Sequence, residues 1–382
     1  MRSQNIQYIS RIDHLRFFAF FMVFYMHHIF WFPTERIKDL NFNGHIFDFK
    51  EILKLWVANG TTGVSLFLVL SGFLFCLIAG GGEKKIRYLP FIYNRILRIF
   101  PLLVFFIFII ITVNRVESGP EAIFRLLTLQ LNTGNPTTGW GHTDNFPTGP
   151  IWTIAVEFQF YLIFPVIISF AKQRGIRWLL LVILLMIVTR ILITGNNNNV
   201  NFWFYLNIYY TIIGRLDQFI IGIIAGIIYL TKKDFLSKIH EQIAIVAMCF
   251  ILFTIVFTIP VATWFGTCFR FTAEGALWSL IIIVYLKFPF PDIQKLDSFL
   301  SWLGSMSFSM YLFHVSVATF FVKTFGMAYP ETFNSLLAQN TIILPGVILF
   351  SILTFYAIEK PFFERRVKYI VNEKEPPASM RE

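Results

Sequence analysis

Three ionisable side chains lie deep inside stretches that are otherwise almost wholly apolar. His27 lies in the run LRFFAFFMVFYMHHIFWF (residues 15–32), Glu157 and His314 lie in later runs, and Arg16 precedes His27 by eleven residues. An imidazole exchanges protons near neutral pH, and ionisable groups inside membrane helices usually mark a substrate path or a reaction site. Eleven residues are about three helical turns, so Arg16 and His27 project near one face, one at the rim and one deep. This spacing suggests a path into the membrane.

The depths of these groups match. His27 and His314 each lie twelve residues into runs that cross in the same direction, about 18 Å from the face at which the chain begins. Glu157 lies six residues into a run that crosses the other way, about 21 Å from that face. We expect Arg215 and Asp217 near the same level. Each group alone could be a hydrogen-bonded core residue or part of a structural ion pair, but the set favours a shared polar chamber that opens outward.

A second group of charges lies in KKIRYLPFIYNRILRIFPLL, residues 84–103. Arg95 and Arg98 have the i, i+3 spacing that puts two side chains on one helix face. Two planar guanidinium groups side by side suit phosphate oxygens. We expect a helix that starts at Pro101, with the two arginines in the loop before it as an anion-binding site. The lysine pair that opens the stretch is better explained as a topological anchor.

The composition predicts the elements that must position these residues. The chain of 382 residues is 56% hydrophobic and 14% charged, against about 25% charged in soluble domains. Apolar runs of this length without period-two alternation favour an all-α polytopic membrane protein of about ten transmembrane helices. The expected spans are 15–32, 62–80, 99–115, 151–171, 177–194, 203–230, 241–260, 270–287, 302–323 and 340–359. The sixth is long enough to be broken or tilted.

The distribution of basic residues predicts the orientation. Most of the 32 Lys and Arg residues fall in the segments that share a side with the N-terminus, which places both termini in the cytoplasm. The net charge of +10 then faces the negative inner leaflet, and nucleic acid is a poor explanation for it. We expect one transmembrane domain over residues 1–370 and a disordered cytoplasmic tail over 371–382. The three cysteines show no metal-ligand spacing, so no metal is expected.

Seven motifs follow one another along the chain in a recognisable order. They are RIDHLRFFAFFMVFYMHH (11–28), GVSLFLVLSGFLF (63–75), NRILRIFPLL (94–103), PIWTIAVEFQFYLIFP (150–165), GRLDQFIIGIIAG (214–226), LGSMSFSMYLFH (303–314) and IEKPF (358–362). Together, over almost the whole chain, they resemble the membrane acyltransferase-3 family of bacterial acyl-CoA-dependent O-acyltransferases. The resemblance implies ten transmembrane helices and an acyl-CoA donor used from the cytoplasm.

The resemblance also assigns roles to residues. The family's Arg-x10-His pattern maps onto Arg16 and His27, and its paired arginines map onto Arg95 and Arg98. Its Trp–Ser-x-x-x-Glu motif maps onto a tryptophan, a threonine in place of the serine, and Glu157. Further positions that we expect in the chamber are Trp152, Thr153, Arg215, Asp217 and His314. The chain departs from the common pattern at three positions, none of which removes an assigned residue: His14, Phe158 and Lys360.

The function that follows is O-acylation at a bacterial cytoplasmic (inner) membrane. Arg95, Arg98 and Arg16 would hold the phosphates of acyl-CoA, with acetyl the favoured acyl group and no permanently bound cofactor. His27 would act as general base on a hydroxyl of an envelope glycan or glycolipid, with lipopolysaccharide among the acceptors considered. Glu157 would orient and stabilise the imidazole, and Arg16 would assist both donor binding and catalysis. The alternative is a transporter or flippase, because intramembrane charges also serve alternating access.

Overall fold

The computed structural model describes residues 8–30, 48–113, 115, 119–130, 151–195, 200–291, 293–327 and 332–371. Within this part, helices form nearly all of the regular structure, and one antiparallel pair of two-residue strands accompanies them. The all-α prediction is therefore confirmed. The predicted tail lies outside the described residues except for residue 371, which ends the second strand.

The described residues of the first half form seven α-helices, one 3-10 turn and one strand. In order these are α1 (Ser10–Phe30), α2 (Phe49–Ala58), α3 (Thr62–Ile78), the 3-10 turn η1 (Gly80–Gly82), β1 (Lys85–Ile86), α4 (Tyr88–Val113), α5 (Pro120–Leu127), α6 (Trp152–Arg174) and α7 (Ile176–Gly195).

The second half adds α8 (Phe202–Tyr209), α9 (Ile212–Thr231), α10 (Ile239–Thr258), α11 (Trp264–Lys287), α12 (Gln294–Ser305), α13 (Ser307–Phe325), α14 (Phe333–Thr354), the π-helical turn η5 (Phe355–Glu359), α15 (Lys360–Phe363) and β2 (Ile370–Val371).

Eight helices in the described residues are long and apolar enough to cross a membrane, and a ninth crossing is possible if α2 and α3, bent by 64°, form one broken span. About 20 apolar residues are needed to cross a hydrocarbon core of about 30 Å. Helix α1 has 21 residues, but Arg11, Asp13 and Arg16 in its first turns lower its hydropathy. The eight helices, the bent pair counted as one span, and α1 together make ten segments of membrane length, the number predicted. The chain is a multi-pass membrane protein.

The predicted boundaries differ from the structure at three places. Helix α4 begins at Tyr88 rather than near residue 99, so Pro101 lies inside it and does not start it. The predicted sixth span is broken as expected, between α8 and α9. The predicted ninth span divides at Met306 into α12 and α13. Pro101 is accommodated because membrane helices tolerate a missing backbone donor when neighbouring groups compensate.

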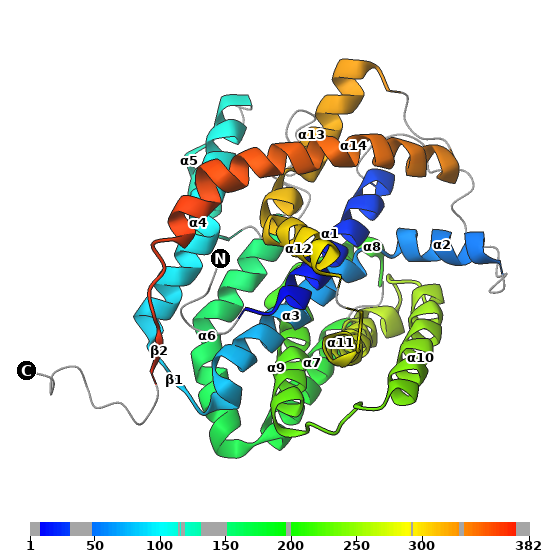
Figure 1. The fold of residues 1–382 in the computed structure, drawn as a ribbon. Coiled ribbons are helices and arrows are strands. Elements are labelled where there is room, and N and C mark those ends of the chain that lie inside the picture. Colours follow the sequence, from blue (N-terminus) through cyan, green and yellow to red (C-terminus); the bar gives the residue numbers. More distant parts are fainter. Residues whose placement is uncertain are drawn as a thin grey trace, which may run out of the picture.

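The core of the bundle is built around α3, whose closest neighbour is α9 (Figure 1). The two backbones approach so closely that a Cβ atom on Gly72 would lie 2.0 Å from the Phe219 carbonyl oxygen. A Cβ on Gly222 would lie 2.1 Å from the carbonyl oxygen of Val69. Small residues at helix contacts allow this approach in membranes, where van der Waals packing drives association. Helix α1 packs on α3, α12 and α13, so the N-terminal helix is enclosed by the bundle.

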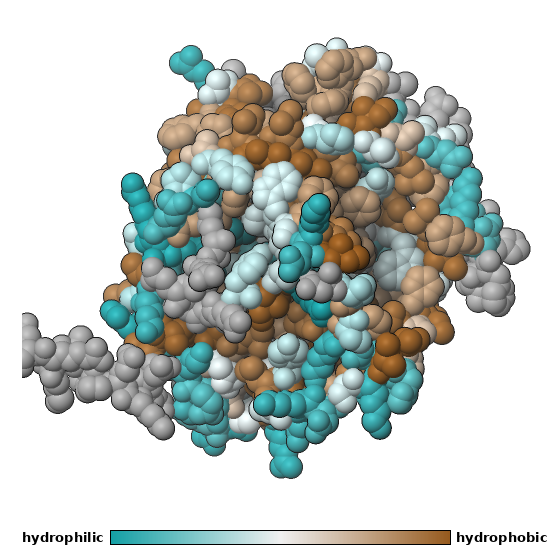
Figure 2. Space-filling model, viewed as in Figure 1, coloured by the Kyte–Doolittle hydropathy of each residue, from teal (hydrophilic) through white to brown (hydrophobic). Residues whose placement is uncertain are grey.

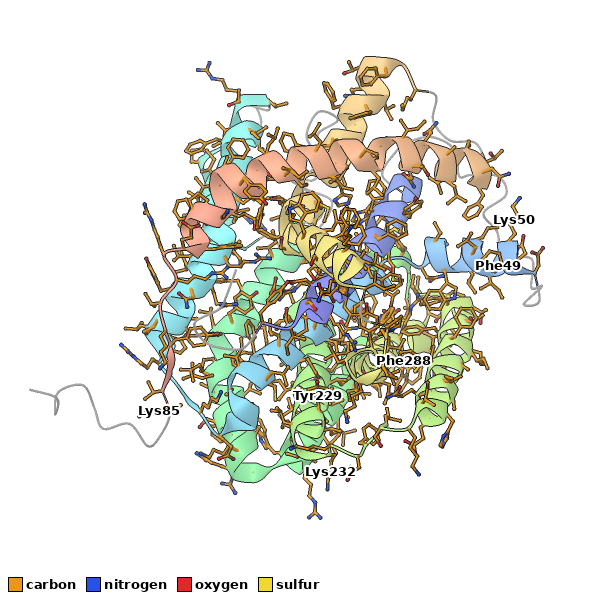
Figure 3. All side chains as sticks on the ribbon, in the orientation of Figure 1. Phe49, Lys50, Lys85, Tyr229, Lys232 and Phe288 are labelled. Carbon is orange, nitrogen blue, oxygen red and sulfur yellow. The ribbon has the colours of Figure 1, made fainter. Side chains whose placement is uncertain are left out.

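The outer surface separates apolar from charged side chains. Figure 2 shows brown apolar residues over much of the visible face and teal hydrophilic residues gathered along its lower edge. Lys232, at the end of α9, lies on that edge (Figure 3). Lys85, on β1, is exposed at one side of the molecule, while Phe49 and Lys50 lie at the opposite side on α2 (Figure 3). Lys85 therefore lies at the periphery of the molecule, and its role as a topological anchor stays a prediction.

Candidate active site

Helices α1 and α13 bring two histidines into contact. The Nδ1 atom of His27 lies 2.7 Å from the Nε2 atom of His314. The two ring planes are almost parallel, at 8°, with centroids 5.0 Å apart. His314 is fully buried against Phe20 and Phe24, whereas His27 is half-buried. The matching depths predicted from the sequence are therefore confirmed for these two residues.

The hydrogen bonds of the pair determine where its protons lie. The Nδ1 atom of His314 is 2.7 Å from the main-chain oxygen of Tyr311. A carbonyl oxygen can only accept, so His314 carries its proton on Nδ1. In a neutral ring Nε2 is then an acceptor, and His27 donates to it from its own Nδ1. The lone pair of neutral His27 is consequently on Nε2, the nitrogen that can take a proton from a substrate.

A small chamber of about 100 Å³ lies one helical turn from this pair. Its polar lining includes Thr153, Glu157 and Tyr311. The Thr153 hydroxyl donates to the Tyr311 hydroxyl at 3.0 Å, and both residues line the chamber, whereas His27 and His314 do not. Because Tyr311 also supplies the carbonyl that fixes His314, one residue connects the chamber wall with the histidine pair.

Glu157 lies in this chamber and makes its contacts there. Its carboxylate accepts hydrogen bonds from Ser71 at 2.9 Å and from Tyr161. We expected Glu157 to orient His27. In this structure the histidine is held by His314 instead, and Glu157 lies one turn below Thr153 on α6, on the side of the chamber towards the arginines.

The three predicted arginines meet at a larger cleft of about 530 Å³, which adjoins the chamber. Arg16, Arg95 and Arg98 line both cavities, so the two spaces follow one another. Arg16 pairs with Asp13 at 2.7 Å, and Arg98 pairs with buried Glu359 at 3.6 Å. A cleft of this size, with convergent charged groups, is typical of a site for a small ligand.

Arg95 and Arg98 lie on helix α4 and not in a loop as predicted, because the helix begins before them. The spacing argument still holds, since residues three apart share a helix face. The guanidinium group of Arg95 lies over three aromatic rings, 5.0 Å from the centroid of Phe75, 5.4 Å from Phe91 and 5.7 Å from Tyr161. Cation–π contacts of this kind hold a guanidinium without neutralising it.

Arg215 and Asp217, expected in the chamber, line neither cavity. Asp217 forms a fully buried ion pair with Arg190 at 2.8 Å. Arg215 is buried over the ring of Tyr209, 3.9 Å from its centroid, and donates to the main-chain oxygen of that residue. Trp152 packs on the same tyrosine, with ring centroids 4.9 Å apart. These side chains form a structural layer beside the site.

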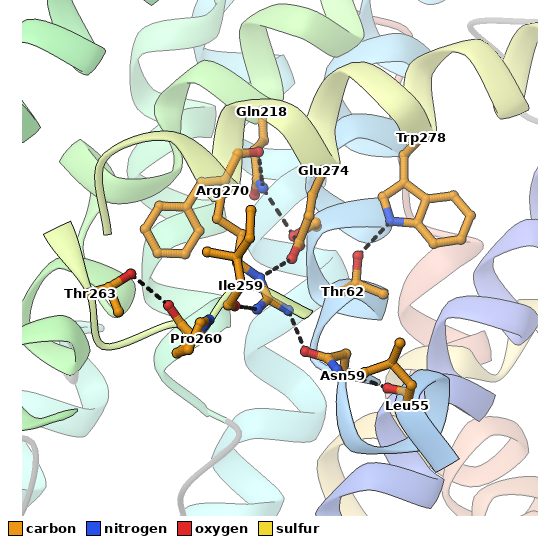
Figure 4. Close-up of polar contacts among 12 residues, drawn as sticks. Leu55, Asn59, Thr62, Gln218, Ile259, Pro260, Thr263, Arg270, Glu274 and Trp278 are labelled. Atoms are coloured by element: carbon orange, nitrogen blue, oxygen red, sulfur yellow. Dashed lines mark hydrogen bonds and ion pairs between the residues drawn. The ribbon is translucent and has the colours of Figure 1, made fainter. Parts of the chain in front are cut away.

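A third buried network joins α3, α9 and α11 (Figure 4). Arg270 pairs with Glu274 at 2.8 Å and donates to Asn59. Glu274 also accepts from Ser65, whose hydroxyl accepts from Gln218. Every member is hydrogen-bonded, as expected for a network that fixes the packing of helices.

Removing one member of such a pair should lower stability. Replacing Asp217 with alanine leaves the Arg190 charge buried without a counter-ion, so we expect a loss of about 3–5 kcal/mol. Thermal unfolding of the purified protein in detergent measures the effect. The control is Asp234→Ala, at an exposed position between α9 and α10, which should change the midpoint little. An Asp217→Ala midpoint equal to that of the control would contradict the structural role.

Sequence reasoning missed several residues of the two cavities. Arg366 and Lys360 line the cleft, and Ser71 and Tyr161 line the chamber. The positive-inside rule alone accounts for the charges near the C-terminus, so it does not single out Arg366 or Lys360. Their position is the available signal, because charged residues directly after a span lie at the membrane surface, where a cleft can open. In the described residues, no cluster of three or more His, Cys, Asp or Glu side chains could hold a metal ion.

Comparison with known proteins agrees with the resemblance. A family described as "Acyltransferase domain" matches residues 9–358. The chain is 26% identical over 289 residues to the O-acetyltransferase OatA of Staphylococcus aureus, covering 69% of this chain and 47% of the relative. It is 22% identical to the peptidoglycan O-acetyltransferase OatA of Listeria monocytogenes, covering 80% and 52%. The chain spans about half the length of these curated relatives. No solved structure matches it.

Proposed function

This chain belongs to the acyltransferase domain family, and from that premise we propose that it transfers an acyl group from acyl-CoA to a hydroxyl of an envelope glycan. The acyl group we favour is acetyl, since the curated relatives are named O-acetyltransferases. Acyl-CoA is used as a co-substrate, and no resident cofactor is part of the proposal. We place the donor on the cytoplasmic side, where the distribution of basic residues predicts both termini, and the protein in the cytoplasmic membrane.

The observation that carries the proposal is the succession of two cavities. The 530 Å³ cleft is rich in arginine, whereas the smaller chamber is lined mainly by apolar side chains with a few hydroxyl and carboxylate groups. The two cavities share Arg16, Arg95 and Arg98. The phosphates of coenzyme A lie at one end of the molecule and its thioester at the other, joined by a long neutral arm. The arginines suit the phosphates, and the chamber suits the arm and the acyl group.

The thioester reaches His27 only if the Tyr311 side chain moves. Tyr311 lines the chamber with its partner Thr153, whereas His27 does not, so we place Tyr311 between the chamber and the histidines. We therefore place a rotation of Tyr311 at the start of the reaction. Lid and side-chain gates of this kind exclude water until both substrates are in place.

The chemical step uses His27 as a general base. The acceptor hydroxyl gives its proton to Nε2 as its oxygen forms a bond to the thioester carbonyl carbon. The carbon–sulfur bond then breaks, and the thiolate of coenzyme A leaves with the proton that His27 returns. His314 accepts the hydrogen bond from Nδ1 throughout and stabilises the charged ring. Neither the direct transfer nor the single base requires a metal or redox step.

We propose peptidoglycan as the first acceptor to test. The Listeria relative is named a peptidoglycan O-acetyltransferase, and a putative peptidoglycan O-acetyltransferase of Bacillus subtilis is 22% identical over 96% of this chain and 58% of its own length. The acceptor approaches from the outer side, opposite to the arginine cleft. Mass spectrometry of envelope glycans from cells with and without the gene tests this. An acyl ester that disappears with the gene supports the proposal, and an unchanged ester content contradicts it.

The rival function, a transporter or flippase, makes a different prediction about coenzyme A. An acyltransferase in membranes releases the free thiol of coenzyme A from acetyl-CoA in proportion to acceptor, which a thiol reagent measures. A transporter releases none. Thiol release that depends on acceptor therefore supports acyl transfer. Transport of the glycan without thiol release would contradict the acyltransferase proposal and favour the transporter.

Arg95→Gln should weaken use of the donor. The Arg95 guanidinium has no carboxylate within ion-pair distance in the described part of the chain. Its removal therefore leaves no buried carboxylate without a counter-ion. Loss of one charge-assisted hydrogen bond costs about 1.5–3 kcal/mol, so we expect the KM for acetyl-CoA to rise at least about tenfold. Steady-state thiol release measures it. Arg87→Gln is the matched control, because Arg87 is exposed just before α4 and lines neither cavity. Equal KM values for the two variants would remove Arg95 from the donor site.

A further inference from the structure

A fourth arginine enters the cleft from the C-terminal end of the chain. Arg366 lies beyond the last helix and lines the cleft together with Arg16, Arg95 and Arg98. Its guanidinium group lies 3.8 Å from the ring centroid of Phe363. The cleft therefore gathers guanidinium groups from three separate segments of the chain: α1, α4 and the segment after α15.

Residues 366–371, which we call the strap, are held against α4 and β1 by hydrogen bonds. Val367, the next residue, exchanges two hydrogen bonds with the Asn94 side chain, which donates to its carbonyl at 2.7 Å and accepts from its N–H at 2.9 Å. The Arg87 N–H donates to the Tyr369 carbonyl, and β2 pairs with β1 beyond it. Asn94 is buried. These bonds hold a non-helical segment against the helix that carries two arginines of the cleft.

The charges of the cleft are not balanced by its own acids. Arg16 and Arg98 each have a carboxylate partner, but within the described residues Arg95 and Arg366 have none. The Nε atom of each is buried and makes no hydrogen bond there. Burial and the like charges of Arg98 and Arg95 lower the pKa of Arg366 to about 8. Burial and like charge therefore destabilise the charged form of Arg366, and an anion in the cleft would relieve this.

We propose that Arg366 binds the phosphate groups of the donor's nucleotide end and that the strap formed by residues 366–371 delivers it to the cleft. The inference rests on the proposed donor. Arg95 and Arg366, which have no carboxylate within ion-pair distance in the described residues, offer bidentate hydrogen bonds to phosphate oxygens from α4 and from the segment after α15. The remaining two arginines keep their carboxylates and contribute mainly to the surrounding positive field.

The test compares two donors in Arg366→Gln. Acetyl-CoA carries the nucleotide phosphates, whereas S-acetylpantetheine carries the same thioester and arm without them. We expect the KM for acetyl-CoA to rise about tenfold or more and the kcat/KM for S-acetylpantetheine to stay as in the unaltered protein. The matched control is Arg365→Gln. Arg365 is exposed, lies over the Phe362 ring and does not line the cleft, so both donors should behave normally.

A second variant separates a phosphate contact from a folding effect. Asn94→Ala releases the strap without touching a charge, and it should reproduce the selective loss with acetyl-CoA. Adenosine 3′,5′-bisphosphate, used as a competitive inhibitor, should bind Arg366→Gln about tenfold more weakly. Equal losses with both donors, or inhibition unchanged from the unaltered protein, would overturn the role of Arg366. If the unaltered protein releases no thiol from acetyl-CoA, the proposed donor fails, which is distinct from an Arg366→Gln variant that behaves normally.

Discussion

Replacing His27 with alanine is expected to lower acyl transfer by about 10²–10⁴-fold, or about 3–5.5 kcal/mol in transition-state stabilisation. The reason is geometric as well as chemical. The Nδ1 proton of His27 is committed to His314 at 2.7 Å, so the ring presents Nε2 as its basic atom. The Glu157 carboxylate is the other candidate base nearby, but it accepts hydrogen bonds from Ser71 and Tyr161 on the arginine side of the chamber. The measurement is acceptor-dependent thiol release from acetyl-CoA in membranes containing equal amounts of protein.

The controls for His27→Ala are chosen to exclude misfolding and a neighbouring base. His27→Ala removes the donor to Nε2 of fully buried His314, which costs about 1–3 kcal/mol, so we expect a lower thermal midpoint but folded protein in the membrane. His28→Ala, which changes the adjacent imidazole in the sequence, should retain most activity. Near-normal transfer by His27→Ala, with loss in His28→Ala, would move the base to the second histidine.

Much of the arrangement could be predicted from the sequence because membrane helices have a fixed rise. Twelve residues into two spans of the same direction put His27 and His314 at one level, and the structure places them in contact. The spacing of Arg95 and Arg98 likewise predicted a shared face, and both line the cleft. The depth of a residue along a helix and the helix face on which it lies depend only on the geometry of that helix. Both can therefore be predicted from a single sequence.

The rotation of one helix about its axis relative to another could not be predicted. Glu157 lies on the arginine side of the chamber, and its carboxylate contacts Ser71 and Tyr161 and not His27. Arg215 and Asp217 lie in a structural layer because α9 turns them towards α7, α8 and α11. The rotation of each helix depends on close backbone contacts, for example that at Gly222. A hydropathy pattern does not predict these contacts.

The role of the C-terminal segment was hidden for a different reason. A basic stretch after the last span satisfies the positive-inside rule. Because that rule already explains the charges, the sequence gives no reason to assign one of them to a binding site. The π-helical turn at residues 355–359 also has no strong sequence signal, although Pro361 follows it closely. The turn brings Phe355 and Tyr356 to the cleft lining, and π-helical turns occur often at functional sites.

His314 should be a positioning residue, and two substitutions can separate this role from simple packing. His314→Phe keeps a ring among Phe20 and Phe24 but removes the acceptor for the His27 proton. His314→Gln retains an acceptor oxygen near the position of Nε2. We expect kcat to fall about 100-fold in the phenylalanine variant, with the KM for acetyl-CoA unchanged, since the arginine cleft is untouched.

The kcat of the glutamine variant should be at least about tenfold higher than that of the phenylalanine variant. The reason is that the amide oxygen can accept from Nδ1 of His27 and so keep Nε2 as the base. A purely structural role would predict the opposite order, since phenylalanine fits an apolar pocket better than an amide does. Steady-state rates at saturating acetyl-CoA, together with thermal midpoints for both variants, decide between them. Equal rates in the two variants, or a faster phenylalanine variant, would mean that the histidine pair is a packing contact and that His27 is oriented by another group.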